Sequence, residues 1–335
     1  MTLVLKNIIK LLIPEFIRKS IREEIYFYKI RDRKVKLGND NKDKTFLVIR
    51  DDNRFSGIGS ILSLVITNII YARKLGYIPV VDLLNVESQY HDKVKVGVEN
   101  AWEYYFLQPS NYNLQDISNS KNVIISIGES GNKKIINKRN IANKIYLFDK
   151  ENINVILEYK KYYKEYIKFI PEIKEKFEND YIKILKNKGR VLGVIGRGTD
   201  FISKKPKNHR VIPEPSVLLN KVIEIYKQEK FDYIYLATED NDIFKLFKDE
   251  FSDKMLDNEQ KRISQSDIEN HYRLSDAEFD YGERQKYKLG IDYLSSINLL
   301  SKCSGICGGV TSATAIAYIM SNGYEFEYFF DLGIY

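Results

Sequence analysis

The chain has 335 residues, of which 44% are hydrophobic, and a formal net charge of +7. This composition excludes long disordered tracts, and the length favours two domains. Its two cysteines lie four positions apart in one apolar stretch, which excludes a disulfide framework and fits a reducing compartment. Because its three histidines are scattered, a conventional zinc site is excluded as well.

The positive charge is concentrated at the N-terminus. Residues 1–38 hold ten Lys or Arg against four Asp or Glu, a surplus of six, so the rest of the chain is nearly neutral and is not typical of a nucleic-acid binder. Lys6 and Lys10 interrupt the apolar run, which is therefore too short to span a bilayer, and the run lacks the features of a secretory signal. Residues 1–40 are interpreted as a basic amphipathic segment that either touches an anionic membrane surface or docks as an ordinary helix.

Strand-like and helix-like stretches alternate along the next part of the chain. Residues 44–50 and 77–84 are short, apolar and β-branched, and the apolar stretch 61–75 between them is long enough for a helix. This βαβ pattern predicts a parallel sheet. Residues 122–128 and 143–149 are predicted to be further strands of an N-terminal domain, residues 41–160.

A second βαβ series follows a charged, tyrosine-rich helical connection at 152–188. The predicted strands are 191–196, 231–240, 254–256 and 305–309, and the predicted helices are 217–229, 242–251, 283–303 and 311–322. The series predicts a C-terminal domain, residues 161–335. The fold expected is α/β, with two Rossmann-like domains facing a cleft.

Ligands of such sheets bind outside the carboxyl ends of the strands. That rule selects four segments, which are 51–60, 197–200, 238–242 and 308–314.

The last of these segments, GGVTSAT, is typical of a phosphate-binding turn. Gly309 lets the backbone turn closely, and Thr311 and Ser312 suit the start of a helix, where backbone N–H groups attract anions. Simple helix capping is the alternative. No Walker lysine follows, so the turn is not a conventional P-loop.

Arg197 ends a buried strand in a polar turn with Gly198 and Asp200. A guanidinium can bind phosphate through two parallel hydrogen bonds, although Arg197 could instead form a structural ion pair with Asp200. A third strand end brings Thr238, Glu239 and Asp240 as acceptors for ribose or base. The Asp-x-Asp pattern at 240–242 resembles a metal motif, but helix capping explains it.

The acceptor hydroxyl of a group transfer needs a general base in many enzymes. Asp51 and Asp52 follow the first predicted strand, with turn formation as the alternative role, and Glu103 is a second candidate. The aromatic residues between positions 102 and 106 form either a platform for a sugar acceptor or part of the core.

The motifs VIGRGTDF, YLATED and LLSKCSGICGGVTSAT resemble the donor-binding half of fucosyltransferase-like glycosyltransferases of GT-B architecture. The positions of His209 and Pro213 are similar to the bacterial members, and GIGS (57–60) and ENAWEYYF (99–106) resemble the N-terminal half more loosely. The resemblance covers residues 45–335 and is firm beyond 190.

The resemblance implies an inverting, metal-independent enzyme that transfers fucose or a related sugar from a GDP-sugar to a cell-surface or lipid-linked glycan, without a cofactor. It implies that Arg197 holds the β-phosphate, that Thr311 and Ser312 contact phosphate, and that Glu239 and Asp240 lie near the nucleotide. The expected location is the cytoplasm, peripherally at the inner face of the membrane.

The sequence departs from the family pattern at three positions. Ile195 replaces a histidine and Gly198 replaces a second arginine. Ser296 replaces an aspartate that recognises the nucleobase, for which Asn298 or Asp292 could substitute. Two alternatives therefore stay open, namely a non-catalytic nucleotide- or glycan-binding protein of the same fold and a transferase for another nucleotide-sugar. The scaffold could also support hydrolysis or epimerisation of nucleotide-sugars.

Overall fold

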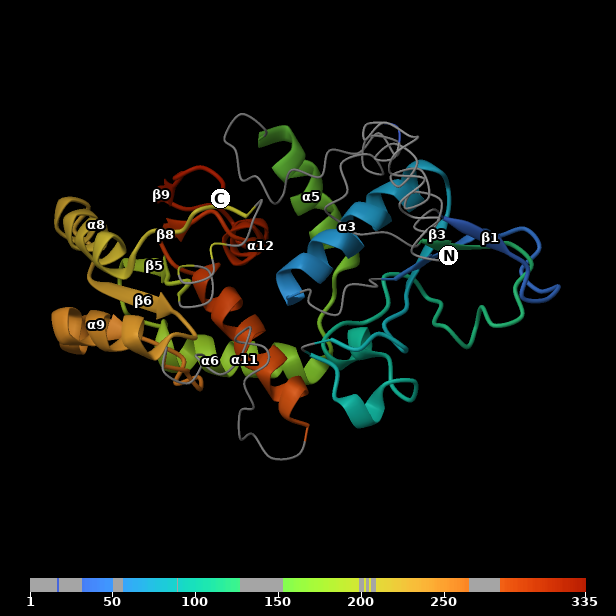
Figure 1. The fold of residues 1–335 in the computed structure, drawn as a ribbon, viewed down its shortest axis with the longest axis horizontal. Helices are drawn as coiled ribbons and strands as arrows, with labels where there is room; N and C mark the ends of the chain where they lie inside the picture. The colour runs from blue at the N-terminus through green and yellow to red at the C-terminus, as the bar shows by residue number, and fades with distance from the viewer. Residues whose placement is uncertain are drawn as a thin grey trace, which may run out of the picture.

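Two β-sheets, each packed against helices, form the computed structural model (Figure 1). It describes residues 32–50, 57–88, 90–126, 153–198, 209–264 and 284–335, and the single positions 17, 202 and 205. We call residues 32–126 the N-terminal half and residues 191–335 the C-terminal half. The predicted α/β class with two Rossmann-like halves is confirmed.

The sheet of the N-terminal half has the strand order β1-β4-β2-β3. Its strands are β1 (Arg33–Val35), β2 (Phe46–Ile49), β3 (Ile78–Val81) and β4 (Val123–Ser126). β2 pairs in parallel with both β3 and β4, whereas β1 is antiparallel to β4. Three of the strands were predicted. β1 was not, because it lies in the basic segment, and the strand predicted at 143–149 lies outside the described residues.

The sheet of the C-terminal half is parallel throughout, in the order β7-β6-β5-β8-β9. Its strands are β5 (Val191–Ile195), β6 (Tyr233–Ala237), β7 (Met255–Leu256), β8 (Gly305–Gly309) and β9 (Phe326–Phe330). Counted along the chain this order is 3-2-1-4-5, as in a Rossmann fold, and it reverses direction between β5 and β8. β9 was not predicted, although the aromatic run FEYFF was a signal for it.

Helices cover both faces of the C-terminal sheet, as Figure 1 shows. One face packs against α8 (Pro215–Gln228) and α9 (Asn241–Phe251), and the other against α11 (Gln285–Leu300) and α12 (Ser312–Met320). The side chains of β5 alternate between the two, since Leu192 and Val194 join the first core and Val191 and Ile195 join the second. The second core is continuous with that of the N-terminal half.

α3 (Ile58–Lys74) lies between the two halves. It packs on β2 and β3 on one side and on α12 and α5 (Ile153–Tyr166) on the other. Thirteen of its 17 residues are buried, which explains why the stretch is apolar all round rather than on one face. The domain boundary predicted at residue 160 falls within α5.

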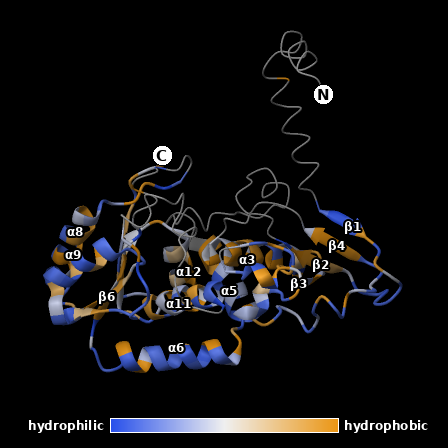
Figure 2. Ribbon diagram, turned by 60° about the horizontal axis from the view of Figure 1, so that its bottom comes forward, coloured by the Kyte–Doolittle hydropathy of each residue, from blue (hydrophilic) through white to orange (hydrophobic). Residues whose placement is uncertain are grey.

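The helical connection consists of α5 followed by α6 (Pro171–Ile184). Pro171 starts α6, where its missing N–H is not needed by the helix. α6 packs on α11 and buries Ile173, Phe177 and Ile184. Most of its residues are coloured as hydrophilic in Figure 2. Short 3-10 turns complete the described elements, at Lys93–Lys95, Ala101–Tyr104 and Ser252–Lys254.

Candidate functional site

The candidate site lies at the carboxyl ends of β5 and β8, where the strand order of the C-terminal sheet reverses. Ile195 at the end of β5 pairs with Gly308 near the end of β8. A Cβ on Gly308 would lie 2.9 Å from the Cβ of Ile195, so glycine permits this close approach. Arg197 and the start of α12 follow directly from these two strand ends. The switch point of an open α/β sheet is where such folds bind ligands.

Arg197 forms an ion pair across the strand ends. Its Nη1 lies 3.1 Å from Oε1 of Glu239, which follows β6, and both side chains are 30% exposed. The alternative predicted partner, Asp200, lies outside the described residues. The structure therefore pairs two of the predicted site residues, Arg197 and Glu239, with one another.

Thr238 and Asp240 have structural hydrogen bonds. The Thr238 hydroxyl donates to the Gly196 carbonyl (2.7 Å) and accepts from the Asp240 amide (3.1 Å). Asp240 is buried and caps α9 by accepting from the amides of Asp242 (2.8 Å) and Ile243 (3.1 Å). The capping explanation of the Asp-x-Asp pattern is confirmed, and contact of Thr238 or Asp240 with a nucleotide stays a prediction.

Gly198 and Gly309 are required by close packing around these strand ends. A Cβ on Gly198 would lie 1.8 Å from Oδ2 of Asp240, and one on Gly309 would lie 2.8 Å from Cγ2 of Ile212. Any larger residue would displace the Asp240 cap or the segment that carries Ile212 and Pro213. The two glycines thus have a packing role that the sequence did not reveal.

The start of α12 has the geometry of an anion-binding turn. Thr311 is the N-cap and accepts from the Thr314 amide (3.2 Å), while the Thr314 hydroxyl donates to the Gly309 carbonyl (2.6 Å). The first turn contains no acidic residue. The amides of Ser312 and Ala313 have no partner within the helix by geometry, so they and the helix dipole favour an anion there.

The N-terminal half contributes the opposite wall of the site. A Cβ on Gly59 in α3 would lie 2.9 Å from the Cβ of Ser312 and 3.0 Å from the hydroxyl of Tyr293 in α11. The first turns of α3 and α12 therefore meet directly. Tyr90 packs its ring 6.3 Å from that of Tyr293, between centroids.

Tyr90 is a buried phenol close to the Arg197 pair. Burial raises the pKa of the Tyr90 hydroxyl far above its usual range. Tyr293 and Glu239 raise this pKa further, whereas Arg197 and the Ile58 amide, which hydrogen bonds to the hydroxyl, lower it. Tyr90 is therefore neutral at any working pH and can donate a hydrogen bond but cannot serve as a general base. The sequence did not predict it, although it lies in the segment after the carboxyl end of β3.

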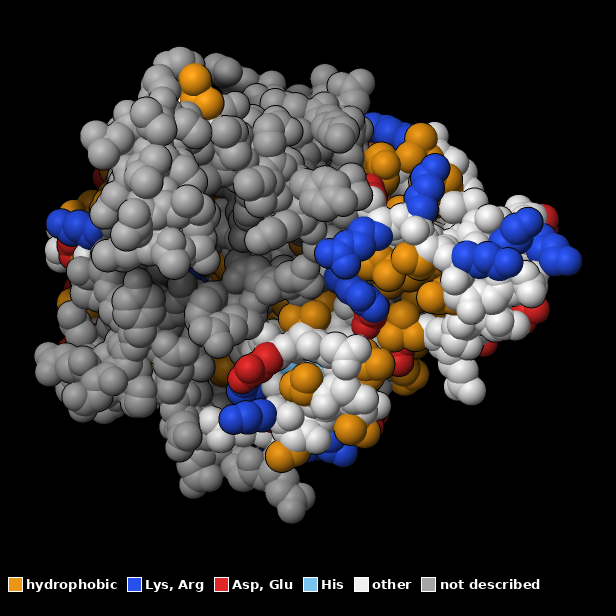
Figure 3. Space-filling model, turned by 45° about the vertical axis from the view of Figure 1, so that its right-hand side comes forward, with side chains coloured by type: hydrophobic (Ala, Val, Ile, Leu, Met, Phe, Trp, Pro, Cys, Tyr) orange, Lys and Arg blue, Asp and Glu red, His pale blue; other side chains and the backbone are white. Residues whose placement is uncertain are grey.

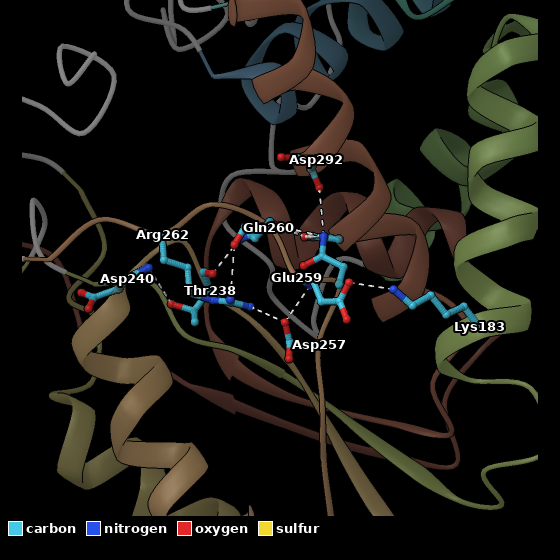
Figure 4. Close-up of polar contacts among 10 residues, drawn as sticks. Lys183, Thr238, Asp240, Asp257, Glu259, Gln260, Arg262 and Asp292 are labelled. Atoms are coloured by element: carbon cyan, nitrogen blue, oxygen red, sulfur yellow. Dashed lines mark hydrogen bonds and ion pairs between the residues drawn. The ribbon is translucent and has the colours of Figure 1, made fainter. Parts of the chain in front are cut away.

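Ser296 in α11 belongs to a polar network beyond the ends of β6 and β7. Figure 4 labels Thr238, Gln260 and Asp292 of this network. Its hydroxyl contacts the side chains of Gln260 (2.5 Å) and Asn258 (2.8 Å). Gln260 also donates to the Thr238 carbonyl (2.6 Å), and Asn258 donates to the Asp292 carbonyl (3.5 Å). These bonds fix the segment that follows β7 against the site. A role for Ser296 in base recognition stays a prediction.

The predicted bases are only partly described. Asp51 and Asp52 lie outside the described residues, directly after Arg50, which pairs with the buried Asp82 at 2.6 Å. That pair joins the carboxyl ends of β2 and β3. Glu103 accepts from Gln108 at 2.7 Å on an exposed surface.

The aromatic residues predicted as a possible sugar platform belong to the core. Trp102, Tyr104, Tyr105 and Phe106 are each at most 5% exposed. The Trp102 indole donates to the Leu107 carbonyl and stacks on Phe106. The core interpretation is confirmed, and an acceptor cannot rest on these rings without rearrangement.

Within the described residues, no group of three or more His, Cys, Asp or Glu is arranged to hold a metal ion. The same part of the chain contains no helix long and apolar enough to cross a membrane.

Comparison with known proteins finds similarity at the level of structure alone. No family model and no curated protein sequence matches the chain. The chain is similar to the NodZ alpha-1,6-fucosyltransferase soaked with GDP-fucose, at 15% identity and a TM-score of 0.48 over 83% of this chain and 93% of that one; NodZ has also been solved from Bradyrhizobium. It is similar to a mutant of Arabidopsis thaliana FUT1 in complex with GDP, at 8% identity and a TM-score of 0.47 over 88% of this chain and 72% of that one. It is also similar to POFUT1 in complex with GDP-fucose, at 9% identity and a TM-score of 0.45 over 86% of this chain and 99% of that one.

Proposed function

We propose that the protein is a glycosyltransferase that binds a nucleoside diphosphate sugar, of GDP type, at the switch point of the C-terminal sheet. The observation that supports this most directly is the position of Arg197 and the α12 N-terminus at the ends of two adjacent strands. Arg197 supplies a permanent positive charge, and the start of α12 supplies backbone N–H groups that lack partners within the helix. A diphosphate carries two anionic groups that match this pair.

These groups also suit the chemistry of glycosyl transfer. Negative charge grows on the departing diphosphate as the glycosidic bond breaks, and donors fixed in advance stabilise that charge in the transition state. In the proposal Arg197 and the first amides of α12 perform this role without a metal. In the proposal the neutral hydroxyl of Tyr90 donates a further hydrogen bond from the wall formed by the N-terminal half. Asp52 is the proposed general base, Gly198 and Asp200 complete the proposed nucleotide site, and Glu239 lies beside it as the partner of Arg197.

A glycan or lipid-linked glycan is the proposed acceptor, and the basic N-terminus is the proposed contact with an anionic membrane. Arg33, Lys34 and Lys36, on and after β1, are exposed and continue the basic segment into the folded part. Figure 3, which brings the side of the N-terminal half forward, shows Lys and Arg side chains among apolar ones, with some Asp and Glu, on the described part of this face. The acceptor is proposed from the motif resemblance. A cytoplasmic location at the inner membrane face is part of the same proposal.

Titration calorimetry with GDP, UDP, CDP and dTDP in EDTA tests the central claim. GDP is expected to bind best. Transfer is tested by measuring the release of GDP from GDP-fucose with glycan acceptors present and subtracting the release measured without an acceptor, which reports hydrolysis. Binding without turnover over a broad acceptor panel would favour the non-catalytic alternative. If none of the four diphosphates binds, the proposed function is wrong.

A further inference from the structure

The ion pair of Arg197 has a counterpart at the opposite end of the same strand. Arg190 precedes β5 and its Nε lies 3.0 Å from Oε2 of Glu325. Arg197 follows β5 and pairs with Glu239 at 3.1 Å. The two pairs use the same chemistry, but only the second lies at the edge where the sheet binds ligands. The pair before β5 is also more open, at 40% and 62% exposure against 30% for both members of the site pair.

Glu239 is held in place by its backbone. Its carbonyl accepts from the Ile263 amide (2.9 Å), and the next residue, Asp240, is locked in the buried cap of α9. The backbone that carries the Glu239 carboxylate is therefore fixed beside Arg197. Tyr90, on the opposite wall, is influenced electrostatically by both members of the pair.

A fixed carboxylate has two opposite effects on an arginine that binds phosphate. It orients the guanidinium before the ligand arrives, which saves ordering cost on binding. It also places a negative charge beside the diphosphate, which weakens the binding of that anion. A carboxylate that bound ribose or base would instead contribute favourable hydrogen bonds, and its removal would then weaken binding.

We propose that Glu239 is a positioning residue that holds Arg197 in place and limits its affinity for the diphosphate, so that the diphosphate product is released. This inference rests on the proposed function and replaces the prediction that Glu239 contacts the nucleotide. It assigns the two members of the pair opposite effects on diphosphate affinity.

Glu239→Gln separates charge from hydrogen bonding, because the amide oxygen can still accept from Arg197. GDP is expected to bind about 5- to 10-fold more tightly to this variant, which corresponds to about 1–1.4 kcal/mol at 1.36 kcal/mol per tenfold. KM for the donor should fall while kcat does not rise. Glu239→Asp keeps the charge but shortens the side chain, so it should lower kcat without tightening GDP binding.

Ionic strength supplies a readout that a merely structural role would not change. The gain in affinity of Glu239→Gln over the natural protein should shrink between about 50 mM and 1 M NaCl, because charges at this exposure are screened by salt. Glu325→Gln is the matched control, since it removes the carboxylate of the equivalent pair at the other end of β5. It should leave GDP affinity and its salt dependence unchanged.

The result that overturns the inference is weaker or unchanged GDP binding by folded Glu239→Gln, with melting temperature as the test of folding. The natural protein could still bind GDP tightly, and Arg197→Ala could still lose that binding. In that case the proposed function stands and only the inference about Glu239 fails. If the natural protein binds no diphosphate, the proposed function fails and the inference fails with it.

Discussion

Replacing Arg197 with alanine is the most direct test of the candidate site. Its guanidinium lies at a strand end with 30% of the side chain exposed, so the truncation opens no core cavity. A partly exposed ion pair contributes at most about 1 kcal/mol to stability. We therefore expect the melting temperature to change little while function changes strongly.

The magnitude follows from the charges and their exposure. Two unit charges 4 Å apart interact with about 4 kcal/mol near a protein surface and about 1 kcal/mol in water. Arg197 lies between these limits, so its loss should cost about 2–3 kcal/mol of diphosphate binding, or roughly 30- to 150-fold in Kd. Loss of one donor fixed in advance for a growing negative charge commonly lowers kcat by about 10²–10³-fold.

Two companion variants refine this test. Arg197→Lys keeps the charge but not the two parallel hydrogen bonds, so it should recover only part of the rate. Arg197→Ala leaves the Glu239 carboxylate facing the diphosphate, so the double change Arg197→Ala with Glu239→Gln should bind GDP more tightly than Arg197→Ala alone.

The assays are calorimetric titration of GDP in EDTA, thermal unfolding, and release of GDP from GDP-fucose. Arg190→Ala, at the other end of β5, is the matched control and should retain GDP affinity. Normal GDP affinity in folded Arg197→Ala would contradict this assignment, because the guanidinium would then contribute nothing to the anion site.

Three further changes test other parts of the structure. Gly59→Ala places a Cβ 2.9 Å from that of Ser312. We expect the cost of overpacking, about 1–3 kcal/mol, to outweigh the gain of about 1 kcal/mol in helix propensity, so the melting temperature and donor affinity should both fall. A higher melting temperature with unchanged donor binding would contradict the contact between the two helix ends. Asp92→Ala removes an acceptor of the Lys286 amide at the start of α11 (2.9 Å) and should cost about 1 kcal/mol of stability in denaturant titrations, as for a lost helix cap. Removal of residues 1–31, which precede β1, should weaken cosedimentation with anionic liposomes and leave GDP affinity intact, and equal cosedimentation would favour an ordinary docked helix.

Much of the fold was predictable because it depends on local patterns. The buried strand runs of β2, β5 and β6 are short and rich in β-branched or aromatic residues, and the helices between them show apolar residues at helical spacing. Parallel pairing follows because helices alternate with strands. β1 escaped prediction because its three residues RKV are mostly exposed and are held only by pairing with β4.

The sequence also determined which side chains end the strands of the C-terminal half, and thus selected Arg197, Thr311 and Ser312 as candidates. It determined the caps as well, since Thr311 and Asp240 occupy the positions that local helix chemistry requires.

The partners of these residues depend on the three-dimensional packing of the chain. The strand order places β5 next to β8 and so brings Arg197 to the start of α12, although more than 100 residues separate them in the chain. The same packing gives Arg197 the partner Glu239 rather than a neighbour in sequence, and brings Gly59 and Tyr90 to the opposite wall. Such contacts depend on strand order and helix packing, which arise from the burial of one shared core and leave no periodic pattern in the sequence.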